Sequence, residues 1–323
     1  MQHLKHLEPS LAILADEANW SYQPGGVPAA EPMALAALAL AAHGRADAAE
    51  HARRKLASLQ ADDGSLGVTA DEPTPQWPTG WAVLAWVSAD RGWRAYQKNI
   101  DRAIGWILSQ HGHTWQRSSK LGHDPAIDGW PWVAGTHPWI EPTAINLLAL
   151  KAAGQADHPR AREAARLLLD RLLPEGGCNY GNTSVFGRLL RPHVEPSGLA
   201  LGALAGEKDQ AGRIEKTLQY LERTLSPALG GVSLAHGLIG LTAHGRRPAE
   251  ADQWISESLR GAKSPFAPRK NALSSNKRRR GGTDSPLRHA LLAIAACDPC
   301  PLLVAAASKE THTPTRSVSE AAG

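Results

Sequence analysis

The sequence predicts an all-α fold, an α/α toroid in which six helical hairpins form an inner and an outer ring of helices. Apolar runs that begin with Glu-Pro recur at Glu31, Glu141 and Glu195. The run PTGWAVLAW from Pro78 has the same form, with Trp77 in the glutamate position. Amphipathic segments alternate with these runs, and the whole pattern returns about every fifty residues, the period of a helical repeat protein.

The apolar runs are predicted to be the inner helices, because a helix that is apolar on all sides is buried and its Ala and Gly residues permit close approach. Proline fits the first helical position, where its missing N–H has no partner to lose. The predicted inner helices span residues 31–43, 78–89, 141–153, 195–206, 232–244 and 285–297. The amphipathic segments are predicted to be outer helices over residues 3–14, 46–60, 96–110, 159–173, 208–225 and 249–262.

A second position recurs 11 residues before the first three apolar runs, where Trp20, Leu66 and Trp130 stand. In the fourth copy Cys178 lies 17 residues before Glu195, which predicts a connection with six extra residues. The last inner helix contains LLAIAAC and has little polar face. An open solenoid needs a polar cap at its end, so helix 285–297 is predicted to close a ring against helices 3–14 and 31–43.

The repeat predicts one toroid domain over residues 1–305, interrupted by a basic disordered loop at 263–284 and followed by a disordered tail at 306–323. The net charge of +4 conceals a difference between the basic loop and the rest of the chain. Residues 260–280 hold eight of the 35 Lys and Arg and no acid, which leaves 27 basic against 31 acidic residues, or −4, elsewhere. We expect that this loop could contact anionic lipid at a membrane surface. Nucleic acid is not expected as a partner.

The sequence contains no apolar stretch of 18 residues, and its start, MQHLKHLEPS, lacks the apolar core of a signal peptide. A cytoplasmic protein is expected. The three cysteines fit a reducing compartment, and the C-x-x-C of Cys297 and Cys300 is a weak motif at a helix end. No metal and no cofactor is predicted.

The loops KLASLQADDGSLG, NWSYQPGG, DGWPW and LLPEGGCNYGN resemble the Q-x-x-D-G-x-W repeat of the prenyltransferase and squalene oxidase repeat family. This family includes squalene-hopene cyclases, other terpenoid cyclases and protein prenyltransferase β subunits, and its fold is the α/α toroid. The resemblance implies that a glutamine and an aromatic residue brace neighbouring hairpins. Gln60, Asp63 and Gly64 match, Leu66 stands where tryptophan is expected, and buried bracing roles are predicted for Trp20 and Trp130.

The resemblance also implies chemistry that the residues only partly match. Cyclases of the family protonate an alkene or epoxide with the strong acid of a D-x-D-D motif, which is absent here. Asp124, Asp128 and Glu141 are the candidate catalytic acids. The zinc of protein prenyltransferases needs Asp, Cys and His ligands, and the residues near Cys297 do not match that motif.

The inner-helix starts should form one rim of a central funnel, so the residues there are predicted to bind substrate: Glu31, Trp77, Trp81, Trp132, His137, Trp139 and Glu195. A structural role for the glutamates, as complements of their own helix dipoles, is the alternative. In a second alternative, Glu141 and Asp128 are the two carboxylates of a glycosidase, although their spacing does not favour it.

Two functions are therefore open. The funnel binds or cyclises an isoprenoid ligand, with cations stabilised over indole rings. Otherwise the toroid is non-catalytic and serves a protein partner as an interaction or assembly module. The missing acid motif favours the second function, and the concentration of Trp residues between positions 77 and 139 favours the first.

Overall fold

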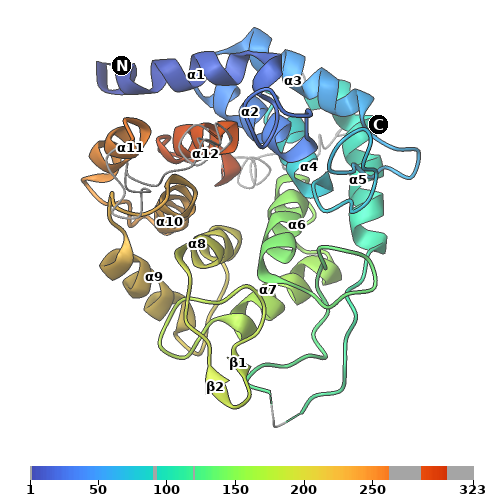
Figure 1. Cartoon of the computed structure of the whole chain (residues 1–323). Helices are drawn as coiled ribbons and strands as arrows, with labels where there is room; N and C mark the ends of the chain where they lie inside the picture. Colours follow the sequence, from blue (N-terminus) through green and yellow to red (C-terminus); the bar gives the residue numbers. More distant parts are fainter. Residues whose placement is uncertain (1, 90–92, 119–120, 262–284, 304–323) are drawn as a thin grey trace, which may run out of the picture.

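The computed structural model describes residues 2–89, 93–118, 121–261 and 285–303, which form an α/α toroid (Figure 1). Within these residues the inner helices make a closed ring, in which each packs against the next and the last packs against the first. They are α2 (Ala30–Ala42), α4 (Thr79–Val87), α6 (Ile140–Ala152), α8 (Val194–Ala203), α10 (Gly231–Ala243) and α12 (Pro286–Ala295). The predicted fold class is confirmed.

An outer ring of amphipathic helices surrounds the inner one (Figure 1). Most outer helices pack against the inner helix that precedes them in the chain, and the first packs against α12. They are α1 (Glu8–Ala15), α3 (Ala46–Ser58), α5 (Gln97–Ser109), α7 (Pro159–Arg171), α9 (Arg213–Thr224) and α11 (Ala251–Leu259). Short 3-10 turns lie at Gln2–Leu7, Glu17–Asn19 and Trp93–Tyr96.

Ring closure follows the prediction. Helix α12 packs against α2 and α1, so the ends of the repeat meet. Two polar contacts reinforce the junction. Ser10 Oγ lies 2.8 Å from His289 Nδ1, and His43 Nε2 lies 2.9 Å from the carbonyl oxygen of Ala293. Closure buries the apolar face of α12 that an open solenoid would expose to water.

The largest boundary error concerns α9, which was predicted from residue 208 and begins at Arg213. The Asp209 carboxylate accepts hydrogen bonds from the backbone N–H groups of Ala211 and Ile214, and Gly212 has a φ of +67°. This capped turn delays the helix. The extra residues before α8 form a hairpin of β1 (Ser184–Val185) and β2 (Arg188–Leu189), with Ser184 opposite Leu189.

The bracing prediction for Trp20 and Trp130 is confirmed. Their side chains are 0% and 1% exposed, and each indole N–H donates to a backbone carbonyl at 2.8 Å, that of Leu14 or of Ile107. Leu66 and Cys178 fill the same position in the other copies and are also buried. Gln60 Nε2 donates to the carbonyl of Asn99 on the neighbouring outer helix, as a brace between hairpins requires.

A hydroxyl in the first turn of the inner helix anchors each bracing residue in three copies. It accepts a hydrogen bond from the backbone N–H of the bracing residue at 2.8–3.0 Å, and the pairs are Leu66 with Thr79, Trp130 with Thr143, and Cys178 with Ser197. These bonds attach each loop to the start of its inner helix, and so they hold the loop residues near the helix start in place.

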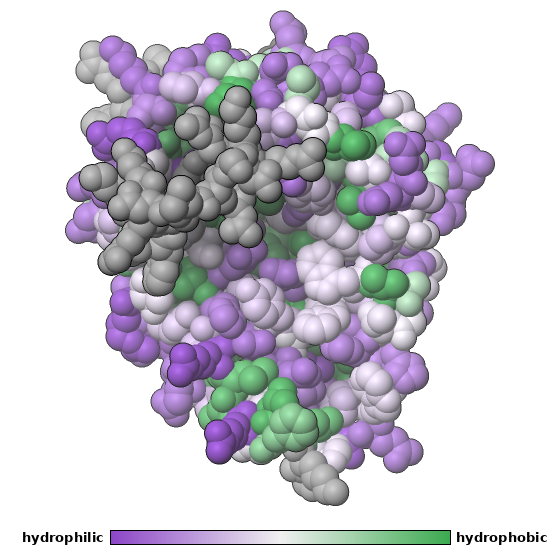
Figure 2. All heavy atoms as spheres, viewed as in Figure 1, coloured by the Kyte–Doolittle hydropathy of each residue, from purple (hydrophilic) through white to green (hydrophobic). Residues whose placement is uncertain are grey.

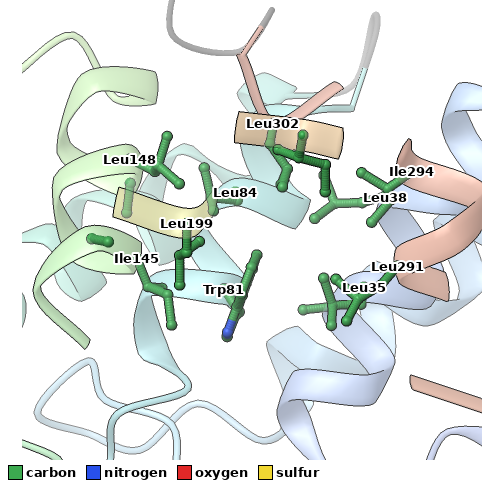
Figure 3. Close-up of a cluster of buried hydrophobic side chains, with 14 of the residues drawn as sticks. Leu35, Leu38, Trp81, Leu84, Ile145, Leu148, Leu199, Leu291, Ile294 and Leu302 are labelled. Atoms are coloured by element: carbon green, nitrogen blue, oxygen red, sulfur yellow. The ribbon is translucent and has the colours of Figure 1, made fainter. Parts of the chain in front are cut away.

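The middle of the ring is packed with side chains rather than open. Figure 3 shows side chains of α2, α4, α6, α8 and α12 directed at one another, with Leu302 among them. All are 0–3% exposed: Leu35, Leu38, Trp81, Leu84, Ile145, Leu148, Leu199, Leu291, Ile294 and Leu302. The expected deep apolar funnel is thus filled where these residues lie, which leaves the rim as the accessible part.

The basic loop at 263–284 and the tail at 306–323 lie outside the described residues. In the part of the chain that the structure describes, no helix has the length and apolar character needed to cross a membrane.

Candidate functional site

Three glutamates gather at one end of the inner ring. Glu31, Glu141 and Glu195 each occupy the second residue of their helix, in α2, α6 and α8. The residue before each of these helices has an extended backbone and provides no side-chain cap. The carboxyl groups are close enough to repel one another, because Glu195 raises the pKa of both Glu31 and Glu141.

The glutamates hold their protons unusually strongly. Burial, followed by repulsion between the carboxylates, raises the pKa of Glu31 and that of Glu141 to about 7. Burial also raises the pKa of Glu195. Among the described residues, no Lys, Arg or His forms an ion pair with any of the three. At neutral pH the cluster therefore contains both carboxylic acid and carboxylate.

Two hydrogen-bond donors lie against the Glu31 carboxyl. The Tyr22 hydroxyl and the Trp81 indole N–H both lower the pKa of Glu31 and so offset part of the effect of burial. Trp81 is 1% exposed, and its Nε1 has no hydrogen-bond partner of ordinary geometry in the described structure. Figure 3 shows this nitrogen turned toward the N-terminal ends of the inner helices. A buried N–H in that position is a donor held ready for a ligand or for the Glu31 carboxylate.

Aromatic side chains separate the acids. Trp77 and Trp132 meet edge to face with centroids 4.8 Å apart. Trp77 lies two residues before α4, which packs between α2 and α6, so this pair stands between Glu31 and Glu141. On the α8 side, burial and the charges of Glu195 and Glu141 raise the pKa of Tyr180. Figure 2 shows pale, ring-shaped side chains around a recess in the middle of this face.

Trp139 and His137 extend the aromatic wall. Trp139 is the residue before α6, and its ring lies 4.4 Å from that of His137. Gly181 admits the indole, since a Cβ there would lie 3.0 Å from Trp139 Cε3. Burial and the charge of Arg171 lower the pKa of His137, which favours its neutral form. The rim thus brings together the residues predicted to bind substrate.

Asp128 lies apart from this cluster. Its carboxylate accepts hydrogen bonds from Arg160 of the outer helix α7 at 2.7 Å and from the backbone N–H of Gly112 at 2.9 Å. The Arg160 guanidinium also lies 4.3 Å above the ring of Trp130. These contacts give Asp128 a bracing role on the outer side of the hairpin. The catalytic role predicted for it stays a prediction, and the site described here does not need it.

Asp124 is also on the outer side. Its carboxylate accepts from the backbone N–H of Ala126 at 3.0 Å and lies 3.8 Å from Arg166. Its own backbone N–H donates to Asp170 at 2.9 Å. Of the three predicted catalytic acids, only Glu141 lies at the rim, and the role predicted for Asp124 likewise stays a prediction.

The sequence analysis missed two residues of the rim, Tyr22 and Tyr180. Each stands two residues after a bracing residue, Trp20 or Cys178, just as Trp132 stands two residues after its own. This repeated spacing was a usable signal. No group of three or more His, Cys, Asp or Glu in the described residues has the geometry of a metal site.

Comparison with known proteins finds no matching family model and no matching curated protein. Among solved structures, a glycosidase variant with a glutamate replaced by alanine, in complex with glucose, aligns with a TM-score of 0.59 and 14% identity over 94% of this chain and 98% of that one. A protein from Actinoplanes aligns with a TM-score of 0.55 and 16% identity over 95% of this chain and 100% of that one.

A further glycosidase variant, with a tyrosine replaced by phenylalanine, aligns with a TM-score of 0.57 and 14% identity over 94% of this chain and 98% of that one. A type II terpene cyclase from Scytonema, in complex with its product merosterolic acid A, reaches a TM-score of only 0.37 at 15% identity, over 93% of this chain and 99% of that one. At these identities the likeness to the glycosidases concerns the fold. The chain is an α/α toroid.

Proposed function

We propose that this toroid cleaves glycosidic bonds, with its general acid and general base drawn from the three rim glutamates. The observation that carries the proposal is that Glu31 and Glu141 form no ion pair with a cation among the described residues, have pKa values of about 7, and share the rim with Glu195. Glycoside hydrolysis needs one carboxylic acid that keeps its proton and one carboxylate nearby. The same cluster also explains the missing D-x-D-D motif, because hydrolysis of a glycoside does not require it.

The hydrogen-bond donors around the glutamates suggest which glutamate is the general base and which is the general acid. The Tyr22 hydroxyl and the Trp81 N–H stabilise the ionised form of Glu31, and no such donor contributes at Glu141. Glu31 is therefore assigned as the carboxylate that activates water or attacks the sugar, although both groups have a pKa of about 7. Burial, together with the charge of Glu31, raises the pKa of Glu141, which is assigned as the acid that protonates the leaving oxygen.

A sugar is the substrate class that the rim fits. Aromatic rings stand near the rim glutamates, with Trp77 and Trp132 in edge-to-face contact and Trp139 beside His137, and the ring interior is filled. Aromatic walls with a few convergent polar groups are typical of small-molecule sites. One of the glycosidase structures that share the fold holds glucose, so substrates that contain glucose are the first choice for a test.

The test is hydrolysis of a panel of glucose-containing disaccharides and aryl glucosides, measured as released glucose between about pH 5 and about pH 8. Glu31→Gln and Glu141→Gln should each lower the rate by about 100- to 10,000-fold, the usual contribution of an acid or base catalyst. Glu175→Gln is the matched control, because Glu175 is exposed and lies on an outer loop. Absence of glucose release by the unaltered protein on the whole panel would refute the proposal.

Isoprenoid binding or cyclisation is the second candidate, and one observation favours it. A protonated carboxyl beside the indole rings of Trp77, Trp81 and Trp132 has the parts of an acid that makes a carbocation and of π faces that stabilise it. The filled ring interior argues against it, because a polyprenyl chain needs a deep apolar cavity. Conversion of squalene or a shorter polyprenyl substrate, followed by mass spectrometry, separates the two. If neither reaction is observed, the interaction module is the function that is left.

A further inference from the structure

One buried histidine in the inner ring has no hydrogen-bond partner of ordinary geometry among the described residues. His236 lies in α10 and is 6% exposed, and the backbone of Val232, one turn earlier, lies near enough only to raise its pKa slightly. Two other histidines at the inner-helix ends are bonded to the backbone, His43 to Ala293 and His244 to Leu201. Those two fix the ends of helices, which His236 does not do.

The repeat places the His236 side chain on the inward face of α10. Val232 occupies the position that Glu31 holds in α2, and His236 follows four residues later. The residues four positions after the other rim residues are directed at the middle of the ring in Figure 3, namely Leu35, Trp81, Ile145 and Leu199. His236 therefore completes the layer of side chains directly below the rim.

The glycines of α10 give independent evidence for this orientation. A Cβ on Gly237 would lie 2.5 Å from a methyl carbon of Leu225, which ends the outer helix α9. A Cβ on Gly240 would lie 2.6 Å from the backbone oxygen of Gly198 in α8. Gly237 thus faces the outer ring and Gly240 faces the neighbouring helix. Consecutive residues of an α-helix are about 100° apart and residues four apart are about 40° apart. His236 therefore lies on the side of α10 that faces α8, about 100° from the outer ring.

A histidine in this position destabilises the fold. Leaving a buried donor or acceptor unpaired costs about 1–3 kcal/mol, and the equivalent positions of α2 and α8 hold Leu35 and Leu199. Burial lowers the pKa of His236 to about 4, so the ring is neutral at physiological pH. A neutral imidazole presents one donor and one acceptor. A residue that breaks the structural rule of a repeat without a structural gain is a candidate for function.

We infer that His236 is a ligand-binding residue, which donates one hydrogen bond to, and accepts another from, hydroxyl groups of a sugar held at the rim. To reach His236, one helical turn below the glutamates, the ligand would have to displace side chains of the layer that fills the ring interior. This inference takes its ligand class from the proposed glycosidase function. Its structural part, that His236 is retained at the expense of stability, does not depend on that function.

The test compares His236→Leu and His236→Gln with the unaltered protein. Leucine restores the residue that the repeat uses, so H236L should unfold at a higher urea concentration than the unaltered protein. It should also weaken glucose binding, measured by calorimetry, and raise the KM for a cleaved glucoside, each by roughly tenfold, while kcat changes much less. H236Q keeps a donor and an acceptor and should recover part of the affinity.

His244→Leu is the matched control, because His244 caps the same helix through its bond to Leu201. It should lower stability and leave glucose binding unchanged. If no glucoside is cleaved, the proposed function fails, and the inference is then decided by thermal-shift measurements on a panel of sugars and polyols. A sugar that stabilises the unaltered protein but not H236L would support it. Equal responses of the two proteins to every compound, or a destabilised H236L, would overturn it.

Discussion

Residues 128–141 supply two regions of opposite character. Asp128 and Trp130 turn to the outer side of the hairpin, where the carboxylate pairs with Arg160 and the indole donates to Ile107. Trp132, Trp139 and Glu141 turn to the rim, where the carboxyl pairs with no cation of the described residues and the tryptophans contact other aromatic rings.

The comparison shows that the partners of a residue, and not its neighbours in the sequence, decide what it does. Asp128 stands beside three tryptophans in the chain and yet is neutralised by a guanidinium and by backbone N–H groups. Glu141 repeats the placement of Glu31 and Glu195, and burial, together with the charges of these two residues, raises its pKa to about 7. An acid with satisfied partners stabilises a fold, and an acid without them is available for chemistry.

The largest expected difference is in stability. Asp128→Ala should lower the free energy of unfolding by about 3–5 kcal/mol, because it removes the closer carboxylate of the buried Arg160 guanidinium and leaves only Glu163 at 3.4 Å. Glu141→Gln, which removes a buried charge and keeps the shape, should cost far less. Urea unfolding of the two variants measures both.

The control for that pair is Asp157→Ala. Asp157 contacts Arg162 at 3.2 Å with both side chains exposed, so its loss should cost about 0–1 kcal/mol. If Glu141→Gln destabilised the protein as strongly as Asp128→Ala, the glutamate would be a brace as well, and the contrast between the two regions would disappear.

The tryptophans should differ in the same direction. Trp130→Ala removes a fully buried side chain and its hydrogen bond and should cost about 3–5 kcal/mol. Trp132→Ala removes a partly exposed ring and one edge-to-face contact with Trp77, worth about 0.5–1.5 kcal/mol beyond its area. Trp132→Ala should instead weaken binding of a glucoside, measured as KM. Similar losses of stability in both variants would show that the whole stretch is scaffold.

The sequence predicts the scaffold better than the site, for a physical reason. Inner helices, outer helices and the braces Trp20 and Trp130 repeat at fixed spacing, because every hairpin must bury the same surfaces. The rim combines one residue from each of several repeats, so its members are brought together only by closure of the ring. Tyr22 and Tyr180 were not predicted, although each repeats the spacing of Trp132 from its bracing residue. His236 escaped notice because a single polar residue in an apolar helix is unremarkable until its lack of partners is known.

A further expected effect is on the pH dependence of stability. The folded pKa values of Glu31 and Glu141, about 7, lie above the ordinary value of 4.5. Their contribution to stability is therefore complete below 4.5 and is lost as the pH rises through 7. The double variant Glu31→Gln with Glu141→Gln should gain stability relative to the unaltered protein as the pH increases over this interval. Urea unfolding at several pH values measures the difference, and a constant difference would mean that neither carboxyl titrates abnormally.

The account depends most on the protonation of the rim, and carbon NMR of the glutamate side-chain carboxyls measures that directly. Comparison of the spectra of the unaltered protein, Glu31→Gln and Glu141→Gln assigns the two signals. We predict that both move with midpoints near pH 7, and that removal of either glutamate lowers the midpoint of the other, because each repels the charge of its neighbour. Midpoints near the ordinary 4.5 for both groups would contradict the account, since the rim would then hold only carboxylates and no acid.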